Sequence, residues 1–251
     1  RVFTGAQGNS IKPTTDNNYV VTGFKYIDAT MPNVGNQIIL QKISPAGSLL
    51  WSQNIATNWA ASTYTQGGDV VANTDGTYTG FGTVRLLNNN TPDYNNFYWY
   101  KTNANGELQS WVSLGDSSTF KTPHTLLSLA DGSYVALGEG RSGTDSNPIY
   151  QTYLIKTDNN GAILWQKSYA GKIGKAMVAT ADGGFVVVGS VQGTGAFQVW
   201  YQLFKVDAGG NLVWEVTGEG GSTGLDIQQT IDGGFITTGT KLTKHNATGV
   251  I

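Results

Sequence analysis

A short sequence pattern recurs five times along the chain, at intervals of 50–59 residues. Each copy has an aspartate, an aromatic residue three positions later and a glycine seven positions later. The aspartates are Asp16, Asp75, Asp131, Asp182 and Asp232. A repeat of about this length indicates a chain of similar structural units, each stacked on the next.

Each unit is predicted to contain four short strands joined by tight turns. In the third copy the predicted strands are 124–129, 134–138, 151–157 and 163–169. Turns such as Asp158-Asn-Asn-Gly161 suit antiparallel hairpins, because Asp bonds to its own backbone and Gly accepts a positive φ. Four antiparallel strands per repeat predict an all-β chain, a single β-propeller domain over 1–251 with about five blades.

The ends of the chain leave two arrangements open. The predicted repeats cover approximately 5–55, 56–114, 115–169, 170–217 and 218–251, the last together with 1–4. Phe3-Thr4-Gly5 resembles the end of a fourth strand, so the two termini could complete one blade and close a five-bladed ring. Alternatively, Gly249-Val-Ile251 resembles the start of a third strand that stops before its lysine and turn, which favours a segment of a larger propeller.

A lysine, a glycine and a tryptophan mark the outer half of each full repeat. The lysines are Lys42, Lys101, Lys156 and Lys205, and the tryptophans are Trp51, Trp111, Trp165 and Trp214. A large aromatic residue at one strand position in every repeat is expected to pack blade against blade rather than to bind sugar. The lysine stems are expected to cover apolar surface. Trp111 comes one position late, which predicts a bulge or a ring turned to the other face.

Composition excludes several classes of function. The charged fraction is 13% and the net charge is −2, so we expect no nucleic-acid partner. There is no cysteine, and no apolar run reaches the ~20 residues of a membrane helix. Only two histidines are present, and the Asp-Gly turns lack the glutamate of a calcium loop. We therefore predict no metal, no cofactor and no membrane insertion. Because the chain starts with Arg1 and shows no signal peptide, we interpret it as a mature or trimmed product.

The motif from Asp182 to Gly189, followed by that from Lys205 to Trp214, resembles repeats of known propellers. These are the propeller repeats of large secreted bacterial surface proteins, and the second half is similar to quinoprotein-like blades. The resemblance implies an extracellular or cell-surface location. It covers the whole chain with departures, such as Asn17-Asn18 in place of Gly-Gly. No residue matches a quinone-binding or sorting motif, so neither a cofactor nor a sorting signal is inferred.

The connections after the second and fourth strands are predicted to share one face and to vary between repeats. Variable loops on a constant frame are where binding sites usually lie. The candidate ligand-binding residues are Tyr26, Trp59, Tyr64, Asp93, Tyr94, Phe120 and Arg141. Aromatic rings beside charged groups suit a glycan or a protein partner, although any one of these rings could simply pin its own loop.

The first strand of each repeat is expected to line a central channel. Matched positions there hold Ser10, Asp69, Thr125, Ala176 and Asp226. Asp69 and Asp226 could serve as the acid and the base or nucleophile of a glycoside hydrolase. Glu139 and Asp116 are further carboxylate candidates on the loop face.

Because no catalytic motif surrounds these carboxylates, the preferred hypothesis is a non-catalytic extracellular module. It would bind or display a glycan or protein partner through the variable loops. One alternative is a structural spacer or subunit of a bacterial surface or secretion assembly. The other is a carbohydrate-active enzyme that uses Asp69 and Asp226.

Overall fold

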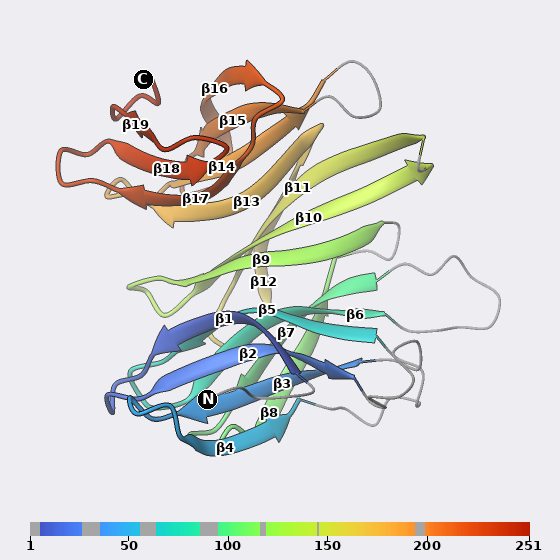
Figure 1. Cartoon of the computed structure of the whole chain (residues 1–251), viewed down its shortest axis with the longest axis vertical. Helices are drawn as coiled ribbons and strands as arrows, with labels where there is room; N and C mark the ends of the chain where they lie inside the picture. Colours follow the sequence, from blue (N-terminus) through green and yellow to red (C-terminus); the bar gives the residue numbers. More distant parts are fainter. Residues whose placement is uncertain are drawn as a thin grey trace. The chain divides into compact units, whose positions relative to one another are not determined.

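The computed structural model describes residues 6–26, 36–55, 64–85, 95–115, 119–144, 146–193 and 199–251. These residues form an all-β structure of antiparallel sheets (Figure 1). Within the described ranges, no helix has the length and apolarity required to cross a membrane.

The first eight strands form two antiparallel groups of four, linked by a single parallel bridge between Asn36 and Tyr64. The first group is β1 (Ala6–Pro13), β2 (Tyr19–Tyr26), β3 (Asn36–Ile43) and β4 (Leu49–Asn54). The second group is β5 (Tyr64–Ala72), β6 (Tyr78–Arg85), β7 (Asn95–Thr102) and β8 (Leu108–Leu114).

The remaining strands form two sheets of four and one of three. The third sheet contains β9 (Phe120–Ser128), β10 (Tyr134–Thr144), β11 (Asn147–Thr157) and β12 (Ile163–Ala170). The fourth contains β13 (Lys172–Ala179), β14 (Phe185–Gln192), β15 (Val199–Val206) and β16 (Leu212–Gly220). The fifth contains β17 (Gly224–Gln229), β18 (Phe235–Gly239) and β19 (Thr243–His245). The prediction of four-stranded antiparallel repeats is thus confirmed at the level of the sheets.

The chain divides into two compact units. The first comprises Arg1–Gly132 and Asp158–Ala162, and the second comprises Ser133–Thr157 and Ile163–Ile251. In each unit the second and third strands of a repeat carry the core. Phe185–Val188 in β14 and Leu203–Phe204 in β15 are almost completely buried. Consecutive buried residues, rather than alternating ones, show that these strands are covered on both faces.

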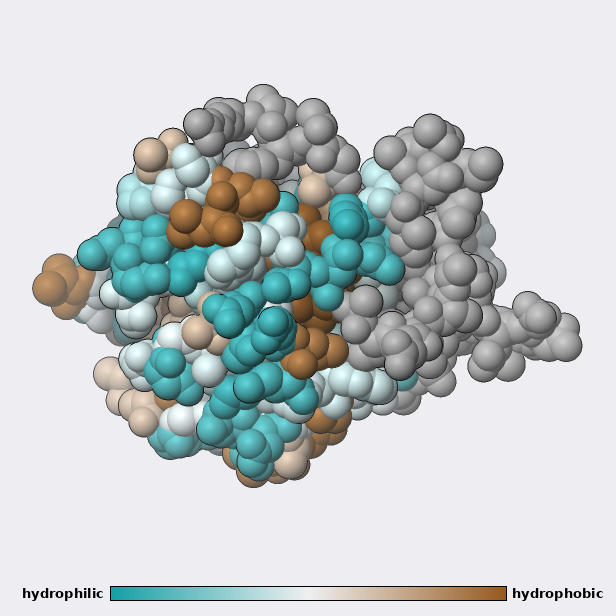
Figure 2. Space-filling view, turned by 90° about the horizontal axis from the view of Figure 1, so that it is seen from below, coloured by the Kyte–Doolittle hydropathy of each residue, from teal (hydrophilic) through white to brown (hydrophobic). Residues whose placement is uncertain are grey.

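Exposed apolar residues lie apart from one another on the described part of the face drawn in Figure 2. Figure 2 shows a face on which hydrophilic residues predominate and hydrophobic residues form separate small patches. Large apolar side chains are exposed one or a few at a time, for example Ile11, Leu50 and Val213. Such scattered exposure is ordinary for folded proteins and by itself marks no binding surface.

In three repeats the lysine of the third strand pairs with the turn aspartate of the same repeat, and Lys244 takes this lysine position in the last repeat. Lys42 Nζ lies 2.6 Å from Asp16 Oδ2, and Lys244 Nζ lies 2.9 Å from Asp232 Oδ2. Lys205 pairs with Asp182 in the same way, and its hydrogen bond lowers the pKa of Asp182 to about 2. The lysine ammonium group therefore links the third strand to the turn between the first and second strands. The sequence had predicted only that the aliphatic part of this lysine covers apolar surface.

Three of the recurrent tryptophans pack against the following repeat. The Trp51, Trp165 and Trp214 rings lie 5.7, 6.4 and 6.4 Å from the rings of Tyr78, Phe185 and Phe235. Each ring also abuts the glycine in the next repeat's last turn. A Cβ added to Gly106 would lie 2.5 Å from the Trp51 ring, so only glycine allows this approach. The expected role as a wedge between blades is confirmed.

Trp111 adopts the second of the two arrangements predicted for it, with its ring turned to the other face of the sheet. It lies opposite Tyr100 in β7, whereas Trp51 lies opposite Lys42. Its ring therefore points to the other face, where it packs 5.5 Å from Tyr98 and stays 43% exposed. The buried ring of Trp99 takes the vacated position and abuts Gly161. The register shift beside Lys101 also occurs beside the other lysines, so no special bulge is needed.

Two sequence-based assignments are wrong. The predicted loop 139–150 is mostly strand, because β10 and β11 extend to Thr144 and Asn147. In the last repeat, Gly249-Val-Ile251 does not begin the third strand. That strand is β19, and Gly249 is the turn glycine, five residues after Lys244 as in the other repeats. The strand escaped detection because Leu242 is the single apolar residue of 240–245, whereas the matched strands carry several.

The wedge predicts unequal costs for two tryptophan substitutions in the same unit. Trp51→Ala should lower the free energy of unfolding by about 3 kcal/mol, because it opens a cavity between two repeats. Trp111→Ala should cost about 1 kcal/mol or less, because that side chain is 43% exposed and does not fill the space between repeats. Urea denaturation followed by circular dichroism measures both. Equal losses would contradict the wedge.

Candidate functional site

The first strand of four repeats carries a β-bulge at one matched position. The register shifts between Gly8 and Ser10, between Gly67 and Asp69, between Gly174 and Ala176, and between Gly224 and Asp226. The sequence predicted that Ser10, Asp69, Ala176 and Asp226 are equivalent, and the register confirms it. Bulges frequently re-aim side chains next to functional sites.

Asp69 is a buried carboxylate with donors from three strands. Its Oδ1 accepts hydrogen bonds from the Ser10 hydroxyl at 2.5 Å and from Val70 N at 2.9 Å. The Lys12 Nζ lies 3.2 Å from the same oxygen. Oδ2 accepts from Leu126 N at 2.9 Å. The side chain is only 5% exposed, so Asp69 is a buried hydrogen-bond acceptor that joins β5 to β1 and β9.

Asp226 has the same local geometry in different surroundings. Its Oδ1 accepts a hydrogen bond from Ile227 N at 2.8 Å, as Asp69 does from Val70 N. However, Asp226 is exposed. In the preceding repeat the equivalent of Ser10 is Ala176, which has no side-chain donor. Asp226 therefore lies at a solvent-accessible position.

Glu139 belongs to β10 rather than to the predicted loop. Lys175 Nζ lies 2.5 Å from Glu139 Oε2, and the glutamate side chain is 11% exposed. Lys175 is the bulged residue of β13, so the bulge turns its ammonium group toward this carboxylate. The other extra candidate, Asp116, lies outside the described residues. Within the described ranges, no group of three or more His, Cys, Asp or Glu residues could hold a metal ion.

The predicted ligand-binding residues are placed only in part. Tyr26 ends β2 and Tyr64 begins β5, and both pair with Asn36, so they share one edge of the first unit. Phe120 begins β9, where the adjacent Lys121 bonds through its backbone to Asn95. These residues lie at strand ends rather than within loops. Arg141 lies in β10, in the second unit. Three residues fall outside the described ranges: Trp59, Asp93 and Tyr94.

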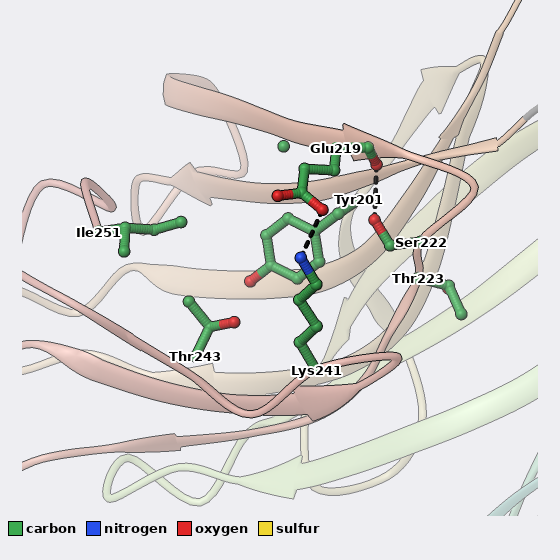
Figure 3. A pocket seen from close by; sticks show the side chains of 8 residues that line it. Tyr201, Glu219, Ser222, Thr223, Lys241, Thr243 and Ile251 are labelled. Carbon is green, nitrogen blue, oxygen red and sulfur yellow. Dashed lines mark hydrogen bonds and ion pairs between the residues drawn. The ribbon is translucent and has the colours of Figure 1, made fainter.

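The sequence did not reveal a pocket of about 230 Å³ in the second unit (Figure 3). Its lining comprises Tyr201, Gly218, Glu219, Ser222, Thr223, Lys241, Thr243 and Ile251. None of these positions repeats along the chain as an obvious motif, so periodicity gave no signal. The sequence also showed no sign that 243–245 forms the strand β19, which places Thr243 in the same pocket as Tyr201 and Gly218.

A buried histidine holds the tyrosine of this pocket. His245 Nδ1–H donates to the Gly249 carbonyl at 3.0 Å, so Nε2 is the acceptor for the Tyr201 hydroxyl at 2.9 Å. The two rings are stacked, with centroids 5.7 Å apart. Burial lowers the pKa of His245 from its ordinary value of 6.5, and the nearby Lys244 adds to this effect. The imidazole is therefore neutral at physiological pH.

Comparisons with known proteins give a likeness of fold. No known family model matches the chain, and no curated protein matches it in sequence. Among solved structures, the GH93 α-L-arabinofuranosidase of Fusarium graminearum with arabinobiose is 10% identical, with a TM-score of 0.52 over 91% of this chain and 70% of that one. Penicillium chrysogenum α-L-arabinanase with arabinobiose is 13% identical, with a TM-score of 0.54 over 96% and 75%.

A Synechocystis apocarotenoid oxygenase is 12% identical, with a TM-score of 0.58 over 98% of this chain and 60% of that one. The likeness thus extends to enzymes of different chemistry, and at these identities it shows the fold alone. The glycosidases among these structures are β-propellers.

The hypothesis of a non-catalytic binding or display module is corrected by this finding. The α-L-arabinofuranosidase and the α-L-arabinanase each match more than nine-tenths of the chain, and they support the enzyme alternative better than the non-catalytic module. The sequence hypothesis depended on the lack of a local catalytic motif. Carboxylates carried on separate strands of a repeat frame would give no such motif, so its lack was weak evidence.

The surroundings of the two aspartates predict different stability effects. Asp69→Ala should lower the free energy of unfolding by about 3 kcal/mol, because it leaves buried donors without an acceptor. Asp226→Ala should change it by about 0.5 kcal/mol or less, because that side chain is exposed. Chemical denaturation of both variants measures the difference. Similar losses would refute the network around Asp69.

The neutral histidine predicts a pH dependence of stability. As the pH falls through 6.5, the unfolded chain binds a proton that the folded chain resists, so the free energy of unfolding should fall. Melting temperatures from pH 8 to pH 5 should decline more steeply for the wild type than for His245→Gln. His124 remains in both proteins and serves as the internal control. Parallel profiles would show that His245 makes no contribution.

Proposed function

We propose that this chain is a carbohydrate-active enzyme that hydrolyses glycosidic bonds in arabinose-containing glycans. The observation that carries the proposal is the fold likeness to arabinose-releasing and arabinan-cleaving enzymes over more than nine-tenths of the chain. The five antiparallel sheets would be the blades of a β-propeller. A glycan would be the partner, as substrate, and an extracellular location would give access to it.

The chemistry of such a reaction needs two carboxyl groups with different roles. One donates a proton to the leaving oxygen, and the other acts as a base or as a nucleophile. In the first unit, Asp69 is held by donors as a fixed acceptor, which suits a base or a nucleophile. In the second unit, Asp226 is open to solvent and is a separate candidate carboxyl group. Glu139, which pairs with Lys175, is a third candidate for one of these two roles.

Hydrolysis of arabinobiose and of arabinan tests the proposal, with released arabinose as the readout. Asp226→Asn and Asp69→Asn should each lower kcat by about 10²–10⁴, the usual contribution of an acid or base. The amide keeps the shape of the side chain but cannot carry the charge. Asp182→Asn, at a turn of the scaffold, is the matched control and should retain activity.

Melting temperatures separate loss of function from loss of fold, which matters most for Asp69→Asn. Full activity in Asp69→Asn, Asp226→Asn and Glu139→Gln would remove these carboxylates from the reaction. A folded wild type that releases no sugar from arabinan, arabinobiose or other plant glycans would refute the function itself.

A further inference from the structure

The pocket of the second unit lies apart from the candidate carboxylates. Its walls come from β15, from the end of β16, from the connection at Ser222–Thr223 and from β19. Neither Asp226 nor Glu139 lines it. It is therefore a separate feature that the proposed reaction leaves unexplained.

A local break in the repeat creates this pocket. In the first three repeats, the pairing between the third and fourth strands shifts register once, directly after the recurrent lysine. The β15–β16 pair has the same shift after Lys205 and a second shift between Trp200 and Gln202. Two residues, Gly218 and Glu219, then face the single residue Tyr201. A Cβ on Gly218 would lie 3.0 Å from the Tyr201 ring, so glycine permits the close approach.

The floor of the pocket also departs from the repeat. Tyr201 lies four residues before its lysine, and the matched residues Ile38, Phe97 and Thr152 are completely buried. Tyr201 is only partly buried. His245 stacks on its ring and accepts its hydroxyl hydrogen, so the ring cannot turn away. The result is an accessible aromatic surface held in one orientation.

The rim supplies a balanced set of polar groups. Lys241 Nζ lies 2.5 Å from Glu219 Oε2, and both side chains are well exposed. The Ser222 hydroxyl donates to the Glu219 carbonyl at 2.6 Å, which anchors the bulge. Figure 3 shows the ion pair beside the Tyr201 ring, with Thr243 and Ile251 across the pocket. The lining carries one positive and one negative charge, so it favours a neutral ligand.

We propose that this pocket binds one neutral sugar residue, with an apolar ring face on Tyr201 and hydroxyl groups on Glu219 and Lys241. An aromatic floor with a few polar groups at the rim fits the two kinds of surface on a sugar ring. At about 230 Å³ the pocket is smaller than the ~300–1,000 Å³ of sites for drug-sized ligands, so it suits a single ring. A second site of this kind would hold a glycan chain to the protein independently of its cleavage.

Binding of arabinobiose, followed by ¹⁵N NMR titration, tests this inference. The Asp226→Asn protein is used so that the sugar stays intact. Amide shifts should concentrate at Gly218, Glu219, Ser222 and Thr223. The Glu219→Ala/Lys241→Ala variant should bind at least about tenfold more weakly, because it loses hydrogen bonds to charged groups. The Lys172→Ala/Glu215→Ala variant removes another ion pair of the same sheet and should bind as before.

Thr243→Phe, which fills the pocket, should also abolish the shifts, and circular dichroism verifies that each variant is folded. Shifts at other residues, or unchanged binding in both pocket variants, would overturn the site. Equal binding of cyclohexanol, a ring with a single hydroxyl, would overturn its assignment to sugar. Because binding is measured without turnover, a failure of hydrolysis leaves this result standing, and the reverse also holds.

Discussion

The contact on which the architecture depends is the tryptophan held between one repeat and the next. A four-stranded antiparallel sheet has two faces to cover, and each repeat covers part of its neighbour through this ring. Trp51 shows the arrangement, between the aromatic ring of Tyr78 and the turn of Gly106. The glycine is as necessary as the ring, because any side chain would occupy the same space. The motif therefore persists along the chain as a requirement of stacking.

The repeat also explains how equal positions acquire unequal chemistry. Asp69 and Asp226 follow the same bulge and accept the same backbone hydrogen bond. The preceding repeat decides the rest. Ser10 provides a donor to Asp69, whereas Ala176 provides none at the corresponding position. One carboxylate is consequently enclosed among donors and the other remains exposed, so a repeated frame can present two acids with different properties.

The features found in one repeat alone arise where the chain departs from the repeat pattern. Trp99 replaces a displaced tryptophan, and a second bulge opens the space over Tyr201. His245 occupies a position that is Ile, Thr or Val in the four earlier repeats. The first departure preserves the stacking and leaves no opening. The other two together expose an aromatic ring and hold it still. A departure that costs buried contacts without restoring them is the better guide to a binding site.

The sequence alone determined the number of repeats, the strands of the first four and the wedge role of the tryptophans. These follow from local chemistry: a turn needs its Asp and Gly, a buried strand needs its apolar residues, and a stacked ring needs its glycine. The tertiary structure decided which aspartate is enclosed, that 243–245 is a strand, and that a pocket forms over Tyr201. Those outcomes depend on residues far apart in the chain, such as Ser10 with Asp69 and Tyr201 with His245, and spacing carries no information about their proximity.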